Sequence, residues 1–94
     1  MKSDLAEQIE QAAAVLRTFG AKEVYVFGSA ATGTLDDDSD VDMAVCGVPP
    51  SVFFRAWARA VRAFPGREMD LIDLDGQNRF GKFLKEKGSL RRVA

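Results

Sequence analysis

A short apolar run ends at a Gly-Ser pair, and after ten intervening residues the chain continues with two aspartates separated by one valine. The run is Val24–Phe27, the pair is Gly28 and Ser29, and the aspartates are Asp40 and Asp42. The apolar run predicts a buried strand. The alternation of acidic or small residues with apolar ones over 40–45 predicts a second strand with one polar face. The chain is therefore constrained to a sheet in which these two strands are linked by a turn and a polar loop.

The rest of the chain alternates helical and strand patterns. Apolar spacing predicts helices over 4–19, from an opening at Pro49-Pro50-Ser51 to about Phe64, and over 78–87. Further strands are expected at 68–74 and, as an edge strand, at 90–93, with one helical turn at 29–33 and a polar loop at 34–39. This order predicts an α/β (α+β) fold, a small mixed β-sheet with helices packed on one face. With no repeat and no linker, residues 1–94 are expected to form a single domain.

The amino-acid composition excludes several kinds of catalytic group, metal site and partner. The chain has no histidine and one cysteine, Cys46. A histidine base is therefore absent, a structural zinc site is disfavoured, and no internal disulfide can form. The net charge of −1 gives no bulk attraction to nucleic acid or to membranes, so neither is expected as a partner. No apolar stretch approaches membrane length and the N-terminus has no apolar signal core, so we expect a cytoplasmic protein.

The acidic residues suggest a metal site. Asp40 and Asp42 are two apart, so both side chains leave one face of a strand, roughly 6.5–7 Å apart. Such carboxylates repel unless a cation lies between them, and Mg²⁺ prefers oxygen ligands with a substrate phosphate among them. A third carboxylate from the 68–74 strand would complete a site for two Mg²⁺ ions. Asp70 is favoured because it lies deeper in the apolar run; Asp73, which faces the opposite side, is the alternative.

Gly28 and Ser29 suit the phosphate end of a nucleotide. Gly28 has no Cβ, so its backbone can approach a ligand closely. The amides of Ser29 and Ala30 would begin a helical turn, which is a natural anion site, and Ser29 adds a hydroxyl donor. The combination predicts a triphosphate cradle beside a metal pair, which is the arrangement of two-metal nucleotidyl transfer. A carboxylate such as Asp70 would take the proton of the acceptor hydroxyl.

These residues together resemble the minimal nucleotidyltransferases of the DNA polymerase β-like superfamily, over nearly the whole chain. The resemblance implies the polymerase β-like nucleotidyltransferase fold. It implies that Gly28 and Ser29 bind the nucleotide phosphates and that Asp40, Asp42 and Asp70 bind two Mg²⁺ ions. It also implies ATP as the substrate and a helical HEPN-type partner protein. In such toxin–antitoxin pairs the transferase can act as the antitoxin and attach AMP to a tyrosine of its partner.

The sequence departs from the family at one position. Thr32 stands where many relatives carry an arginine, which removes a positive charge near the phosphates and bears on turnover rather than on fold. One alternative is therefore a catalytically weak or inactive module that binds and neutralises a helical partner. A more distant one is a modifier of aminoglycoside-type small molecules, whose relatives usually carry an extra helical domain. The acceptor, the preferred base and the oligomeric state, including a possible oligomer, do not follow from the sequence.

Two other motifs fail. Residues 28–33 have the glycine spacing of a P-loop, but Thr34 stands where the lysine belongs. The acidic stretch 36–40 begins like a calcium-binding EF-hand loop, but Val41 and Gly47 occupy the required glycine and glutamate positions. Residues 36–38 are therefore expected to be a solvated acidic loop.

The second predicted helix has an unusual polar side. Arg55, Arg59 and Arg62 form a basic stripe, interpreted either as a solvated face or as a docking site for an acidic partner or RNA. Phe54 lies off the apolar stripe of this helix, so we expect it to be an exposed contact residue.

Overall fold

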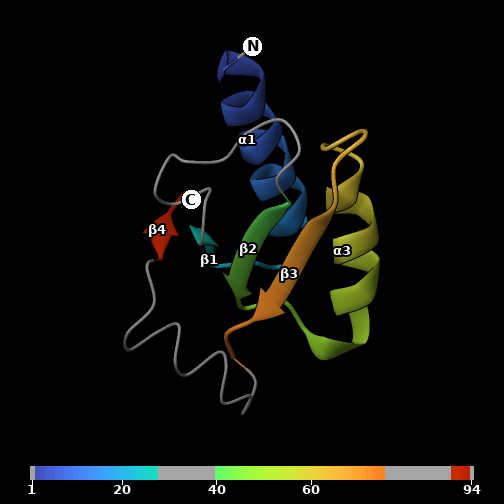
Figure 1. Cartoon of the computed structure of the whole chain (residues 1–94). Coiled ribbons are helices and arrows are strands. Elements are labelled where there is room, and N and C mark those ends of the chain that lie inside the picture. Colours follow the sequence, from blue (N-terminus) through green and yellow to red (C-terminus); the bar gives the residue numbers. More distant parts are fainter. Residues whose placement is uncertain (1, 28–39, 76–89, 94) are drawn as a thin grey trace.

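The structure, a computed structural model, describes residues 2–27, 40–75 and 90–93 (Figure 1). Its elements are α1 (Lys2–Thr18), β1 (Glu23–Phe27), β2 (Val41–Cys46), the 3₁₀ turn η1 (Pro50–Val52), α3 (Phe53–Val61), β3 (Met69–Asp73) and β4 (Arg91–Arg92). Each predicted strand is confirmed to within one residue at either end. The second helix differs, because it opens with η1 and α3 ends at Val61 rather than near Phe64. The predicted turn at 29–33, the loop at 34–39 and the helix at 78–87 lie outside the described residues.

The four strands form one mixed sheet in the order β3-β2-β1-β4. β1 runs antiparallel to both β2 and β4, whereas β2 and β3 are parallel. Parallel neighbours need a crossover connection, and α3 supplies it between β2 and β3 (Figure 1). The two strands on which acidic residues were predicted to meet are therefore direct neighbours.

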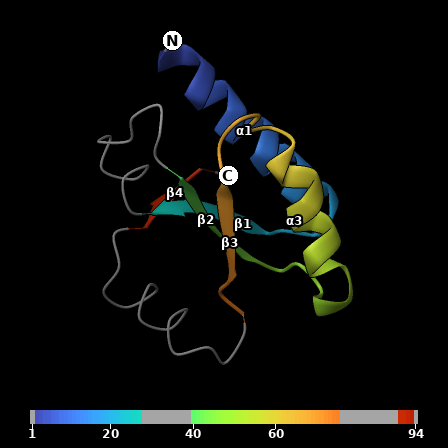
Figure 2. The same ribbon diagram turned by 45° about the vertical axis from the view of Figure 1, so that its right-hand side comes forward.

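The two faces of the sheet differ in what covers them. Alternate residues of a strand point to the same face of the sheet. On one face, apolar residues such as Val24, Met43 and Leu71 form the main core with buried residues of α1 and α3. Both helices lie on this side of the sheet (Figure 2), which confirms the predicted packing. On the other face, residues including Ala44 and Ile72 belong to a second, smaller apolar cluster. No helix in the described part of the chain is both long and apolar enough to span a membrane.

Backbone geometry at the end of α1 sets the start of β1. Gly20 has φ +109° and donates its N–H to the Arg17 carbonyl at 3.0 Å, while the N–H of Ala21 reaches the Leu16 carbonyl at 3.1 Å. These two bonds form a Schellman motif, which requires a left-handed residue and so favours glycine. The backbone then passes close to Gly47, where an added Cβ would lie 2.8 Å from the Gly20 oxygen. This close approach joins the entrance of β1 to the exit of β2.

Two hydrogen bonds hold the beginning of β3. The indole Nε1 of Trp57 on α3 donates to the Met69 carbonyl at 2.8 Å. The N–H of Val41 donates to the Glu68 carbonyl at 2.9 Å. Together they attach the first residues of β3 to the crossover helix and to β2. The residue that follows Met69 is Asp70, so this end of the strand carries the predicted third carboxylate.

Candidate active site

Asp42 and Asp70 lie opposite each other on the parallel strands β2 and β3. The register pairs them directly, one step beyond the pair of Val41 with Met69. Side chains alternate along a strand, and the apolar residues at 41, 43, 69 and 71 belong to the helix-covered core. Asp42 and Asp70 therefore both project from the other face, at the end of the sheet where both strands begin.

The electrostatics of Asp42 show that three carboxylates share this region. Asp42 is half-buried, whereas Asp40 and Asp70 are exposed. The pKa of Asp42 is raised, first because partial burial disfavours its charged form, and then because the negative charges of Asp70 and Asp40 repel it. Phe27, the register partner of Asp42 on β1, is an apolar neighbour on the opposite side from Asp70. None of the described residues that shift the pKa of Asp42 carries a positive charge that would stabilise its ionised form.

Asp73 is placed differently. It pairs with Val45, and the alternation of side chains along β3 places it on the sheet face that the helices cover. Its Oδ1 accepts the N–H of Asp75 at 2.9 Å, and a carboxylate oxygen of Asp75 in turn accepts the N–H of Gly47. Asp73 therefore closes a turn after β3. Of the two candidates for the third carboxylate, the geometry favours Asp70.

The donor set suits a hard divalent cation. Carboxylate oxygens are the ligands that Mg²⁺ prefers, and a cation beside Asp42 would relieve the repulsion that raises its pKa. Within residues 2–27, 40–75 and 90–93, no three acidic, cysteine or histidine side chains are arranged as a complete metal site. Mg²⁺ is commonly held by one or two carboxylates together with substrate phosphates, so Asp42 and Asp70 can hold it when the nucleotide supplies the remaining oxygens.

Some of the site could be located from the sequence and some could not. Gly28 and Ser29 were predicted to bind phosphate and lie outside the described residues, as does Thr32. Two residues that support the site were missed: Phe27, which flanks Asp42, and Trp57, whose hydrogen bond holds the strand of the third carboxylate. Only the position of Phe27 just before the Gly-Ser pair could have indicated its role.

A mixed sheet with helices on one face and paired carboxylates on the other is the architecture that the sequence motif led us to expect of a nucleotidyltransferase. Residues 9–93 match the family model described as the nucleotidyltransferase domain. Because this match spans most of the 94 residues, the chain belongs to the nucleotidyltransferase domain family. No curated protein matches the chain.

Two solved toxin–antitoxin structures share the fold. One is a toxin–antitoxin with AMP-PNP, at 20% identity and a TM-score of 0.65, and the match covers 93% of this chain and 70% of the other. The second is a mutant of the toxin–antitoxin MntA-HpeT, at 16% identity and a TM-score of 0.65, covering 88% of this chain and 69% of the other. At these identities the likeness establishes the fold, which agrees with the family assignment.

Proposed function

We propose that this domain is a Mg²⁺-dependent nucleotidyltransferase that transfers a nucleoside monophosphate, AMP from ATP, to a hydroxyl on a partner protein. The observation that carries the proposal is the direct pairing of Asp42 with Asp70 on the sheet face away from α1 and α3, with Asp40 close enough to perturb Asp42. Family membership supplies the reaction class. The nucleotide analogue in a structure of the same fold supports ATP as the substrate.

Each residue has a defined task in this proposal. Asp42 and Asp70 bind the divalent ions, with Asp40 as a further ligand, while Gly28 and Ser29 bind the triphosphate through backbone amides and a hydroxyl. When bound, two Mg²⁺ ions lower the pKa of the acceptor hydroxyl and neutralise the triphosphate and the leaving pyrophosphate. The acceptor oxygen bonds to the α-phosphorus as the bond to pyrophosphate breaks. The exposed carboxylate of Asp70 takes the acceptor proton.

We further propose that the acceptor is a tyrosine on a helical HEPN-type partner and that this domain is the antitoxin of the pair. The toxin–antitoxin systems that share its fold support this assignment. Asp70 is exposed and lies at the end of a sheet face away from α1 and α3, so an acceptor on a separate protein can reach it. The exposure of Asp70 at this end of the sheet suits a macromolecular acceptor.

The test uses the purified domain, the protein encoded by the neighbouring gene, Mg²⁺ and ATP labelled on the α-phosphate. We expect label on the partner, lost with Asp42→Asn and with Asp70→Asn but retained with Asp73→Asn. The Asp73 variant is the matched control, because it removes the same charge from the same strand outside the carboxylate pair. Label that survives Asp42→Asn would refute the proposed chemistry.

A second candidate is a binding module with the same fold that neutralises its partner without catalysis. The neutral Thr32, at a position where many relatives carry arginine, favours it. In that case the partner binds tightly, no label is transferred, and binding is insensitive to Asp42→Asn. The same experiment, with binding measured alongside labelling, separates the two candidates.

A further inference from the structure

The outer surface of α3 carries an unneutralised positive charge. Residues 47–67 contain four arginines and no acidic residue, although the whole chain has a net charge of −1. Arg55, Arg59 and Arg62 are all exposed and recur at the spacing that places them on one side of a helix. None of the three forms an ion pair with any residue in 2–27, 40–75 or 90–93. Like charges at this spacing repel each other, so the stripe is a cost to the isolated helix.

An exposed aromatic residue adjoins this stripe. Phe54 is 74% exposed, although it is a large apolar side chain. Its ring is nonetheless held in place, because it stacks on Trp57 with 6.2 Å between centroids and 16° between planes. Phe53 meets it edge to face at 5.7 Å. A rigid aromatic beside arginines is the composition typical of energetically dominant positions in protein–protein interfaces.

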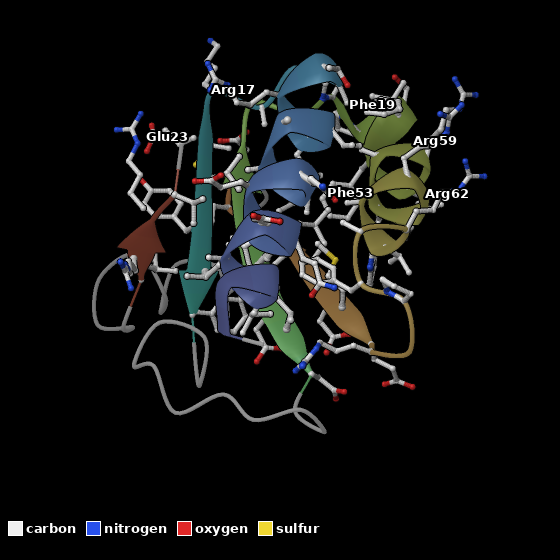
Figure 3. The ribbon with its side chains drawn as sticks, turned by 90° about the horizontal axis from the view of Figure 1, so that it is seen from above. Arg17, Phe19, Glu23, Phe53, Arg59 and Arg62 are labelled. Atoms are coloured by element: carbon white, nitrogen blue, oxygen red, sulfur yellow. The ribbon has the colours of Figure 1, made fainter. Side chains whose placement is uncertain are left out.

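A groove between α1 and α3 borders the other side of the stripe. Its volume is about 320 Å³, and Val15, Phe19 and Ala63 provide its apolar lining. Arg59 on α3 and Arg62, the residue that caps its C-terminal end, line the groove and extend away from the sheet, as Figure 3 shows. A ligand in this groove would contact an apolar surface and two guanidinium groups together.

The positions of the charged residues around the groove favour one class of anionic ligand over another. Arg55 and Arg62 are seven residues apart, or about 10.5 Å along the helix axis, a span that acidic residues on one face of a second helix can match. Gln11 lines the α1 side of the groove, and the exposed Glu7 lies one helical turn before it on α1. A nucleic acid strand extending past Gln11 would bring its phosphates towards this negative charge, whereas a short segment confined to the arginines would not. The surface therefore suits a segment with a few discrete carboxylates beside apolar side chains.

We propose that this α3 surface, consisting of Phe54, Arg55, Arg59, Arg62 and the adjoining groove, binds an acidic amphipathic helix of a partner protein. Such a helix places apolar side chains against Phe54 and in the groove, with carboxylates on the arginines. The surface lies on the side of the sheet opposite Asp42 and Asp70. A partner docked there leaves the carboxylates accessible, so docking does not depend on the proposed transfer reaction.

The test measures binding of a synthetic amphipathic helical peptide that carries leucines on one edge and glutamates at positions i, i+4 and i+7. Trp57 is the only tryptophan of the chain and stacks on Phe54, so its fluorescence reports binding. We expect the double variant Arg59→Glu/Arg62→Glu to bind at least tenfold more weakly, and Phe54→Ala about fivefold more weakly. The matched control is Arg17→Glu, the charge reversal of another exposed arginine, which lies on α1 outside the groove and should bind as the wild type does.

A second peptide guards against variants that merely misfold. With lysines in place of the glutamates, it should bind the double variant and not the wild type. A single-stranded ten-nucleotide oligonucleotide is the competing ligand. Absence of a fluorescence change with the acidic peptide, equal weakening by Arg17→Glu, or tighter binding of the oligonucleotide would overturn the proposal.

Discussion

Replacing Asp42 by asparagine should stabilise the metal-free protein at neutral pH. Asp42 is paired in register with Asp70, and its carboxylate is both half-buried and repelled by its acidic neighbours. Asparagine has nearly the same shape but no charge. The substitution therefore removes the repulsion and the cost of partly burying a carboxylate while keeping a side chain of similar shape beside Phe27, its register partner on β1.

The size of this effect follows from the strand geometry. Neighbouring strands lie about 4.8 Å apart. Two unit charges about 5 Å apart repel by roughly 0.8 kcal/mol in a medium as polar as water and by roughly 3 kcal/mol at an effective dielectric constant of about 20. Because Asp70 is exposed, the lower part of this range applies, and Asp42→Asn should add about 1 kcal/mol to the free energy of unfolding. In a domain of this length that raises Tm by roughly 4–8 °C.

Thermal and urea denaturation followed by circular dichroism, at pH 7 in EDTA, measure the effect. Asp73→Asn is the control: it removes the same charge from β3, keeps an oxygen for the Asp75 N–H, and should change stability by less than about 0.5 kcal/mol. Mg²⁺ with AMP-PNP, at the same concentration for both proteins, should raise the Tm of the wild type more than that of Asp42→Asn. An Asp42→Asn protein no more stable than the wild type in EDTA, or a control that gains as much, would refute the reasoning.

Three other predictions concern pH, the attachment of β3 and a tight turn. The raised pKa of Asp42 means that the folded state favours its protonated form, so this contribution to stability is complete below about pH 3.8 and is lost as pH rises through the raised value. The stability difference between Asp42→Asn and the wild type, measured by urea denaturation in EDTA, should therefore vanish at low pH; a difference that persists contradicts the assignment. Trp57→Phe keeps an aromatic ring but removes the pyrrole part of the indole with its donor to Met69. It should lower the free energy of unfolding by about 1 kcal/mol or more and reduce nucleotidyl transfer, whereas unchanged stability would show that the bond is dispensable. Gly47→Ala should lower Tm more than Gly66→Ala. Both glycines have positive φ, but of the two only Gly47 would place a Cβ closer than 3.0 Å to backbone atoms. Equal losses of Tm in a thermal melt would show that this close approach does not contribute to stability.

The sequence predicted local structure more fully than the contacts between elements. The strands at β1, β2 and β3 follow from short apolar or alternating runs, which depend only on neighbouring residues. The boundary of α3 was less predictable, because the pattern of apolar residues continues through the turn at 62–64 after the α-helix ends at Val61. The exposure of Phe54 followed from its place off the apolar stripe of α3.

In the candidate site, too, local features could be predicted from the sequence and contacts between strands could not. That Asp40 and Asp42 share a face, and that Asp70 and Asp73 do not, follows from alternation along a strand. The pairing of Asp42 with Asp70 depends on which strands adjoin and in what register, and both are decided by packing across the crossover helix. The bond between Trp57 and Met69 joins residues twelve apart through that packing, so no local pattern could predict it.

The most direct test of the central claim is calorimetric titration of Mg²⁺ and AMP-PNP into the wild-type domain and its three asparagine variants. If Asp42 and Asp70 jointly hold the metal-bound nucleotide, either Asp42→Asn or Asp70→Asn should weaken binding at least tenfold, while Asp73→Asn should bind as the wild type does. Equal affinity in all four proteins would contradict the claim that the paired carboxylates of β2 and β3 form the metal site.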